Sequence, residues 1–395
     1  MKEFDLVIIG RGVIGNLAAL TASKANLKVL IVGPEHKPVT NKRFGSRSYA
    51  LSPPSIDFIS RITDENDTEL EHQKIFSMQI FNESAKVILD ATEANQKYLA
   101  QIVNHNSLLK HLSIPNASKR IKCIDQKPLS LSYAQTSDGE KVIVEFAEGS
   151  TTSKVCSKLI IGADGMSSWV RQSAGIFWGR KNYNQKAIVA EILPENEHQG
   201  VACQWFYDGG VLALLPCLGG NLSMVWSVSS TFSNKILNQT PDKLLQHVSQ
   251  ISQNLFGSLK LVTKPTSVDL AMTFADRYYG KRIALLGDAA HTVHPLAGLG
   301  LNLGIYDLIS LSDHGDWFNA SKGNLFDPGC KKKLINFHKN RINKVPQVQF
   351  SLDALVSFYG ASGSFASFIR GFGMNFVDRY ALIKKRLIDQ AQSVF

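Results

Sequence analysis

The chain has 395 residues, of which 44% are hydrophobic and 19% are charged, a balance that excludes a wholly disordered protein. The length favours two domains and a tail over one core. The formal charge of +10 fits an anionic membrane surface, but no nucleic-acid motif accompanies it, so no nucleic-acid partner is expected.

The first 32 residues predict the opening of a βαβ unit. Phe4–Ile9 is continuously apolar, as expected of a strand buried on both faces of a parallel sheet. A helix is expected over Val13–Ala25 and a second strand over Lys28–Val32. This order is typical of a nucleotide-binding α/β fold.

A G-x-G-x-x-G pattern formed by Gly10, Gly12 and Gly15 lies between that strand and that helix. Gly10 permits a tight turn, Gly12 lets backbone amides approach a pyrophosphate, and Gly15 lets the helix pack closely on the sheet. The helix N-terminus, with Val13 and Ile14, directs unpaired N–H groups at the phosphates. The pattern predicts a bound dinucleotide; the alternative is a turn that serves packing only.

The acid that usually follows the second strand and holds the ribose 2′-hydroxyl is absent. Val32 is followed by Gly33 and Pro34, and Glu35 comes two positions late. Glu35, a backbone group or a water molecule would then hold the ribose.

The middle of the chain predicts a second, sheet-rich domain. Alternating polarity over Lys74–Thr92 indicates sheet, and a helix is expected to end over Ser107–Leu112. One further helix is expected over Pro241–Leu255. The other expected strands are Val142–Phe146, Lys158–Ile161, Lys186–Ile192, Val211–Leu215, Leu222–Val228 and Arg282–Leu286.

Two later strands end in an aspartate. Lys158–Ile161 runs into Gly162-Ala163-Asp164-Gly165, and Arg282–Leu286 runs into Gly287-Asp288. Carboxyl ends of parallel strands are where open α/β sheets bind ligands. The carboxylate of Asp288 is therefore suited to accept hydrogen bonds from hydroxyl groups such as those of a ribityl chain.

Together these segments resemble the flavoprotein monooxygenases of the aromatic-hydroxylase fold. The run from His291 to Gly304 is similar to that of the ubiquinone-biosynthesis hydroxylases, which are FAD-dependent aromatic-ring monooxygenases. The resemblance implies that Asp164 and Gly165 lie near the pyrophosphate and that Asp288 holds the ribityl chain. It implies further cofactor contacts from Arg47, Leu108, Pro295, Gly298, Leu299, Gly300, Leu301 and Asn302.

The implied fold is α/β, a Rossmann-like FAD-binding domain with an inserted sheet-rich substrate domain and a C-terminal helical tail. The FAD-binding domain is expected over residues 1–73, 93–180 and 275–345. The substrate domain is expected over 74–92 and 181–274, and the C-terminal helical region over 346–395.

The implied activity is hydroxylation of the aromatic ring of a polyprenylated phenol or quinol intermediate in ubiquinone biosynthesis, through a flavin hydroperoxide. FAD is the expected cofactor, and NAD(P)H or another reductant is the electron donor. Pro295 and Gly298, in the flavin loop, are the candidates for a catalytic role, and no catalytic base is identified. No metal is expected, because His291 and His294 lack a third ligand.

Departures from the family pattern leave alternatives open. Leu299 replaces the usual Gln, Asn104 replaces the usual Glu, and the strand-two acid is missing. One alternative is therefore a non-catalytic scaffold subunit of a quinone-biosynthesis complex. Others are a flavin-dependent halogenase, whose W-x-W-x-I-P pattern is absent around Trp226, and an isoprenoid reductase.

The tail carries apolar residues at near-helical spacing with basic residues alongside. Such a face suits a membrane surface, a partner protein or the chain's own core. A cytoplasmic location, peripheral to the inner membrane, is expected, together with association with a quinone-biosynthesis complex and a homo-oligomer. The apolar residues are Phe365, Phe368, Ile369, Phe372, Phe376, Val377 and Tyr380.

Overall fold

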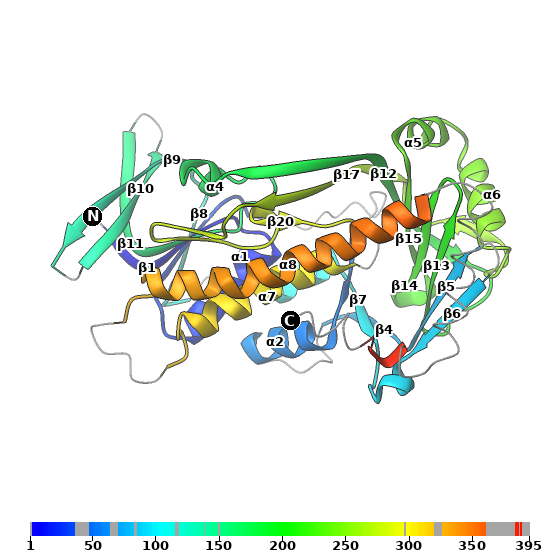
Figure 1. Cartoon of the computed structure of the whole chain (residues 1–395), viewed down its shortest axis with the longest axis horizontal. Coiled ribbons are helices and arrows are strands. Elements are labelled where there is room, and N and C mark those ends of the chain that lie inside the picture. The colour runs from blue at the N-terminus through cyan, green and yellow to red at the C-terminus, as the bar shows by residue number, and fades with distance from the viewer. Residues whose placement is uncertain are drawn as a thin grey trace.

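The structure is a computed structural model in which two large sheets and one small sheet carry the helices (Figure 1). It describes residues 2–35, 47–63, 70–82, 85–114, 118–137, 139–148, 151–295, 298–319, 326–360, 384–386 and 388. The expected amphipathic face at residues 365–380 lies outside these ranges. Among the described residues, no helix has both the length and the hydropathy that crossing a membrane requires.

The first sheet is the nucleotide-binding sheet that the sequence predicts. Its order is β18-β19-β11-β1-β2-β8, and the contacts of β1 with β2 and β11, of β2 with β8 and of β11 with β19 are all parallel. Strands β9 and β10 extend it beside β11. The bounds are β1 Lys2–Ile9, β2 Val29–Val32, β8 Ile121–Ile124, β9 Pro128–Thr136, β10 Gly139–Glu148, β11 Thr151–Gly162, β18 Tyr279–Gly280 and β19 Ile283–Leu285.

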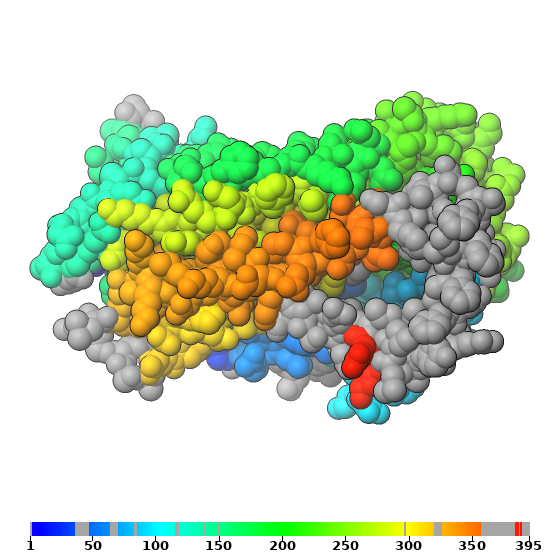
Figure 2. All heavy atoms as spheres, viewed as in Figure 1, coloured from blue at the N-terminus to red at the C-terminus, as the bar shows by residue number. Residues whose placement is uncertain are grey.

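Helices α1, α7 and α8 pack beside this sheet. α1 (Val13–Lys24) and α7 (Leu299–His314) contact one another, and α8 (Lys331–Gly360) runs along α7 (Figure 1). Figure 2 shows α8, in orange, exposed along one face of the molecule. The helix continues through Pro346, so the domain boundary expected at residue 346 falls within it.

The second sheet has the order β20-β17-β12-β15-β14-β13-β5-β6, with β16 beside β12. Its long strands β12 and β17 extend from the side of the first sheet to α5 and α6 (Figure 1). The bounds are β5 Ser77–Asn82, β6 Ala85–Asp90, β12 Trp178–Pro194, β13 Val201–Tyr207, β14 Gly210–Pro216, β15 Leu222–Ser229, β16 Leu259–Leu261, β17 Thr266–Ala275 and β20 His291–Thr292. The helices are α5 Ser230–Leu237 and α6 Pro241–Ile251.

A three-stranded sheet of order β3-β7-β4 contacts α2, α3 and α7 and, through β4, strand β14 of the second sheet, whereas α4 packs on β11 and β19 of the first sheet. The bounds are β3 Ser48–Leu51, β4 His72–Ile75, β7 Ala100–Asn104, α2 Pro53–Thr63, α3 His105–His111 and α4 Trp169–Ser173. Short 3-10 helices are η1 Ala91–Ala94, η2 Leu218–Gly220 and η3 Gly287–Ala289.

Helix α6 ends earlier than the expected Leu255. Gln253 and Asn254 have φ of 51° and 54°, in the left-handed region, so the chain cannot continue as a right-handed helix. The spacing of apolar residues does not reveal such a turn, because Leu255 and Phe256 maintain the apolar pattern beyond it.

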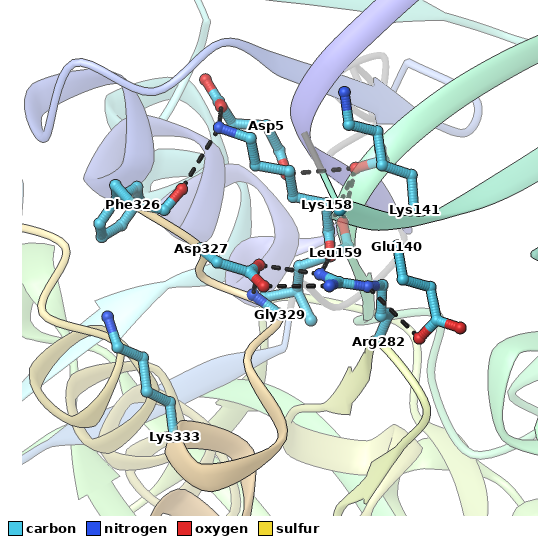
Figure 3. A network of polar contacts seen from close by, with 12 residues as sticks. Asp5, Glu140, Lys141, Lys158, Leu159, Arg282, Phe326, Asp327, Gly329 and Lys333 are labelled. Atoms are coloured by element: carbon cyan, nitrogen blue, oxygen red, sulfur yellow. Dashed lines mark hydrogen bonds and ion pairs between the residues drawn. The ribbon is translucent and has the colours of Figure 1, made fainter. Parts of the chain in front are cut away.

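A cluster of charged residues fixes the start of α8 against the first sheet (Figure 3). Arg282 forms a bidentate pair with Asp327 at 2.8 and 3.0 Å and also donates to the carbonyl of Lys158 at 3.0 Å. A Cβ at Gly329 would lie 2.1 Å from the Lys158 carbonyl oxygen, so only glycine fits at this position. These contacts position α8, whose Arg341 pairs with Asp307 of α7.

Candidate functional site

Two glycines of the G-x-G-x-x-G pattern are required by protein packing. Gly10 leaves β1 with φ of 111°, and a Cβ there would lie 2.2 Å from the carbonyl oxygen of Ala163. A Cβ at Gly15 would lie 1.9 Å from the Gly10 carbonyl oxygen. The turn, α1 and the Gly162–Gly165 segment therefore pack closely only with glycine at both positions.

Two other glycines face open space. A Cβ at Gly12 or at Gly165 would meet no atom within 4 Å. Gly12 is also the N-cap of α1 and provides no side-chain cap, so the first N–H groups of the helix point outward unpaired. The backbone is thus accessible where a pyrophosphate is expected, and the residues fit that group.

The carboxylate of Asp164 has one engaged and one unengaged oxygen. Its Oδ2 accepts from the Val170 N–H at 3.1 Å, whereas the buried Oδ1 has no hydrogen-bond partner. Burial raises the pKa of this carboxyl, and hydrogen bonds from Ser168 and Val170 act in the opposite direction. A buried acceptor without a partner is costly, so Oδ1 is suited to a donor from a ligand or a water molecule.

Asp288 lies at the carboxyl end of β19 in η3. Its side chain is exposed by surface area, yet surrounding protein raises its pKa by desolvation, while Arg47 and His291 lower it. Because Arg47 lowers the pKa of Asp288, the two side chains lie close enough to interact, although 241 positions (288 − 47) separate them in the sequence.

Tyr49 joins this pair, although the sequence assigned it no role. The Arg47 guanidinium lies 5.0 Å from the centre of the Tyr49 ring, and the Tyr49 hydroxyl shares a hydrogen bond of 3.0 Å with His105 Nδ1. Burial raises the pKa of Tyr49, and Asp288 also raises it, whereas Arg47 lowers it. Its place two residues after Arg47, an expected cofactor contact, is the sequence signal for it.

A buried ionic network supports the turn that carries Asp288. Asp307 is fully buried, and its Oδ2 accepts from His291 Nε2 at 2.7 Å and from the Gly287 N–H at 2.9 Å. Its Oδ1 accepts from Arg341 Nε at 2.7 Å. Burial alone would raise the pKa of Asp307, but His291 and Arg341 outweigh it and hold the pKa below its ordinary value. The network thus holds η3 between α7 and α8.

The flavin-loop segment is held mainly through Asn302. Gly298, with φ of 62°, is the N-cap of α7, and its N–H donates to the Pro295 carbonyl at 3.1 Å. The Asn302 amide donates to the carbonyls of Ala50 and Gly298, and its oxygen accepts from the Ser52 N–H at 2.9 Å. The Asn302 side chain is therefore occupied by protein groups, which leaves only its backbone for a cofactor.

The remaining expected contacts differ in their access to a ligand. Leu299 and Leu301 are partly buried and pack against the core, whereas a Cβ at Gly300 would meet only Val293, at 3.9 Å. Leu108 has 0% of its surface exposed, so its side chain supports the core. Val13 is buried, and Ile14 packs against Gly287 and Gly304, where α1 meets α7.

His294 is a buried imidazole beside the loop. Its Nε2 donates to Gln185 Oε1 at 3.4 Å, and its Nδ1 has no hydrogen-bond partner. Burial lowers its pKa to about 4, so the ring is neutral at pH 7 and is a poor acceptor for a phenolic proton. Within the described ranges, no group of three His, Cys, Asp or Glu side chains is arranged to hold a metal ion.

The sequence is similar to those of known FAD-binding proteins. The family described as FAD binding domain matches residues 3–314. The chain is 26% identical to ubiquinone hydroxylase UbiL of Rhodospirillum rubrum, over 99% of this chain and 90% of that protein. It is 28% identical to 3-demethoxyubiquinol 3-hydroxylase of Escherichia coli, over 78% of each chain.

Solved structures share the fold. The p-nitrophenol 4-monooxygenase PnpA of Pseudomonas putida superposes with a TM-score of 0.76 at 14% identity, over 100% of this chain and 99% of that one. The flavin-dependent halogenase CmlS superposes with a TM-score of 0.70 at 16% identity, over 96% and 72%. Because one fold serves different chemistries, these structures indicate architecture and not reaction. The family match, which spans most of the chain, confirms the resemblance: the protein belongs to the FAD-binding domain family and binds FAD.

Proposed function

We propose that this chain is an FAD-dependent monooxygenase that hydroxylates the aromatic ring of a polyprenylated phenol or quinol on the route to ubiquinone. The observation that carries the proposal is similarity along nearly the whole chain to proteins named for that chemistry. Human ubiquinone biosynthesis monooxygenase COQ6 is 26% identical over 98% of this chain and 92% of that protein.

Bound FAD supplies the two-electron carrier and the activation of dioxygen, which no side chain provides. The chain contributes position and electrostatics. The first amides of α1, behind Gly12, would bind the pyrophosphate, and the Asp288 carboxylate would accept hydrogen bonds from ribityl hydroxyls. The N-terminal end of α7, which begins after Gly298, would stabilise negative charge on the flavin ring.

The aromatic substrate lies, in this proposal, between the Pro295–Gly300 loop and the second sheet. Exclusion of water there favours transfer of oxygen to the ring over release of hydrogen peroxide. NAD(P)H is the proposed reductant, and the proton acceptor for the phenol is left unassigned because His294 is too weak a base. A polyprenylated substrate dissolves in the membrane, so we propose peripheral association of the protein with its surface.

The reaction is tested by deleting the gene and identifying the quinone precursor that accumulates. The expected result is a prenylated phenol that lacks one ring hydroxyl, with restored ubiquinone when the wild-type gene is returned. Normal ubiquinone in a strain without a redundant hydroxylase would contradict the substrate.

The scaffold alternative is separated by purification and turnover. A yellow protein that consumes one dioxygen per hydroxylated product supports the enzyme. A colourless protein that does not bind added FAD would instead support a scaffold. Chlorinated product would indicate a halogenase, and saturation of a prenyl double bond without oxygen uptake would indicate a reductase.

A further inference from the structure

The carboxyl end of β2 carries no acid for the adenosine ribose. Gly33 ends the strand with φ of 141°, and its N–H donates to the Ile124 carbonyl at 3.0 Å. Residues with a side chain rarely adopt this φ, so an acid at position 33 would be strained. Another group must therefore act at this point of the cofactor site.

Arg11 occupies the space beside Gly33. A Cβ at Gly33 would lie 3.3 Å from the Arg11 backbone nitrogen and 3.7 Å from its Cγ. Arg11 Nη1 donates to the Gly33 carbonyl at 3.5 Å, which is long for a hydrogen bond. The arginine thus lies back over the end of β2, where the acid would otherwise lie.

The guanidinium retains donors that the protein does not use. Its Nε is buried without a hydrogen-bond partner, and a guanidinium has five N–H donors in all. It also lies within electrostatic range of Cys123 on β8, the strand beside β2. Burial raises the pKa of the Cys123 thiol, and the exposed Glu35 also raises it, whereas Arg11 lowers it.

We propose that Arg11 binds the adenosine ribose of the cofactor by donating a hydrogen bond to its 2′-hydroxyl oxygen, in place of the missing acid. A hydroxyl both donates and accepts, so a cationic donor can replace an anionic acceptor. The exchange has a consequence for specificity. A carboxylate repels a 2′-phosphate, whereas an arginine accommodates it, so this subsite tolerates a 2′-phosphorylated adenosine.

The proposal is tested by titrating FAD-free protein with FAD and with an FAD analogue that lacks the adenosine 2′-hydroxyl. Wild type should bind the analogue about tenfold more weakly, the effect of one charge-assisted hydrogen bond. Arg11→Ala should bind FAD about tenfold more weakly and no longer distinguish the two ligands. Competition should show 2′-phospho-ADP-ribose binding to wild type at least as well as ADP-ribose.

Arg120→Ala is the matched control. Arg120 also donates to a backbone carbonyl, that of Asn26 at 3.0 Å, but at the opposite end of β2, so its loss should leave both affinities unchanged. Glu35→Gln should retain the discrimination. FMN lacks the adenosine, so its affinity should be the same in wild type and Arg11→Ala, which also reports that the variant folds.

Tenfold discrimination that persists in Arg11→Ala would overturn the proposal, because Arg11 would then only support Gly33. Discrimination that disappears in Glu35→Gln would do the same. Should Arg11→Ala fail to bind FMN, Arg11→Met, which keeps most of the side-chain length but donates no hydrogen bond, provides the same comparison. These measurements involve no aromatic substrate, so they are independent of the proposed reaction.

Discussion

The guanidinium of Arg171 donates from Nη1 to the carbonyl oxygen of Ala289 at 2.7 Å. Its Nη2 donates to the carbonyl of Met166, also at 2.7 Å. Arg171 is 1% exposed and lies on α4, which follows the Gly162–Gly165 turn. Ala289 directly follows Asp288. One buried side chain therefore fixes the distance between two motifs that are separated along the chain.

Arg171→Ala should lower the free energy of unfolding by about 3 kcal/mol, because two charge-assisted hydrogen bonds are lost and the buried carbonyl of Ala289 is left without a donor. Urea unfolding of the FAD-free protein measures the change. Arg120→Ala, at an exposed position directly before β8, should change the free energy of unfolding by less than about 0.5 kcal/mol. Equal effects of the two variants would mean that Arg171 does not fix the motifs.

Gly12→Ala and Gly15→Ala should separate binding from folding. Alanine at Gly12 meets no protein atom, so stability should be nearly unchanged while FAD affinity falls at least tenfold. Alanine at Gly15 would clash with the Gly10 carbonyl oxygen, so the FAD-free protein should lose more than about 2 kcal/mol. Calorimetry with and without FAD distinguishes them; a stable Gly15→Ala protein would contradict the packing described.

Asp307→Asn should destabilise the protein by about 3–5 kcal/mol at pH 7, because it leaves Arg341 buried beside a neutral group. The pKa of Asp307 is lower in the folded protein, so its contribution is present above the unfolded pKa near 4 and is lost as the pH falls further. Stability should therefore fall more steeply below pH 4 in wild type than in Asp307→Asn. Parallel curves would show that the carboxylate is not the stabilising group.

His294 should affect the stability of the protein over a different pH range. Its pKa is about 4 in the folded protein and about 6.5 when unfolded, so its contribution is present above pH 6.5 and is lost as the pH falls towards 4. Over that range wild type should lose up to about 3 kcal/mol more than His294→Gln. Unfolding at pH 7, 5.5 and 4.5 measures the difference. An NMR titration of the His294 ring near pH 6.5 would refute its burial as a neutral group.

The sequence predicted the parts of the fold that local patterns encode. Apolar runs gave β1, β2 and β19, and Gly10–Gly15, Asp164 and Asp288 were placed at the strand ends where they lie. The family membership inferred from these motifs is confirmed by the match over residues 3–314. The cofactor contacts of these residues and the domain boundaries stay predictions.

Other features depend on contacts between distant segments. The first half of β12 is polar, Arg180-Lys181-Asn182, and forms a strand only because β17 pairs with it. Arg341 lies on a helix whose sequence shows no sign that this cation meets Asp307. Asn302 was expected near the cofactor, yet its side chain bonds Ser52 and Ala50, which lie some 250 positions earlier. No local pattern contains such pairings.

We propose that Asp288 binds the flavin together with stretches of the chain that lie far from it in the sequence. This binding is tested most directly by measuring FAD retained by Asp288→Ala after gel filtration, beside Asp269→Ala, an exposed aspartate of the second sheet. Asp288→Ala should fold, lose most of its FAD and bind added FAD at least tenfold more weakly, whereas Asp269→Ala should keep a full complement. An Asp288→Ala protein that retains FAD as firmly as wild type would show that this carboxylate does not bind the flavin.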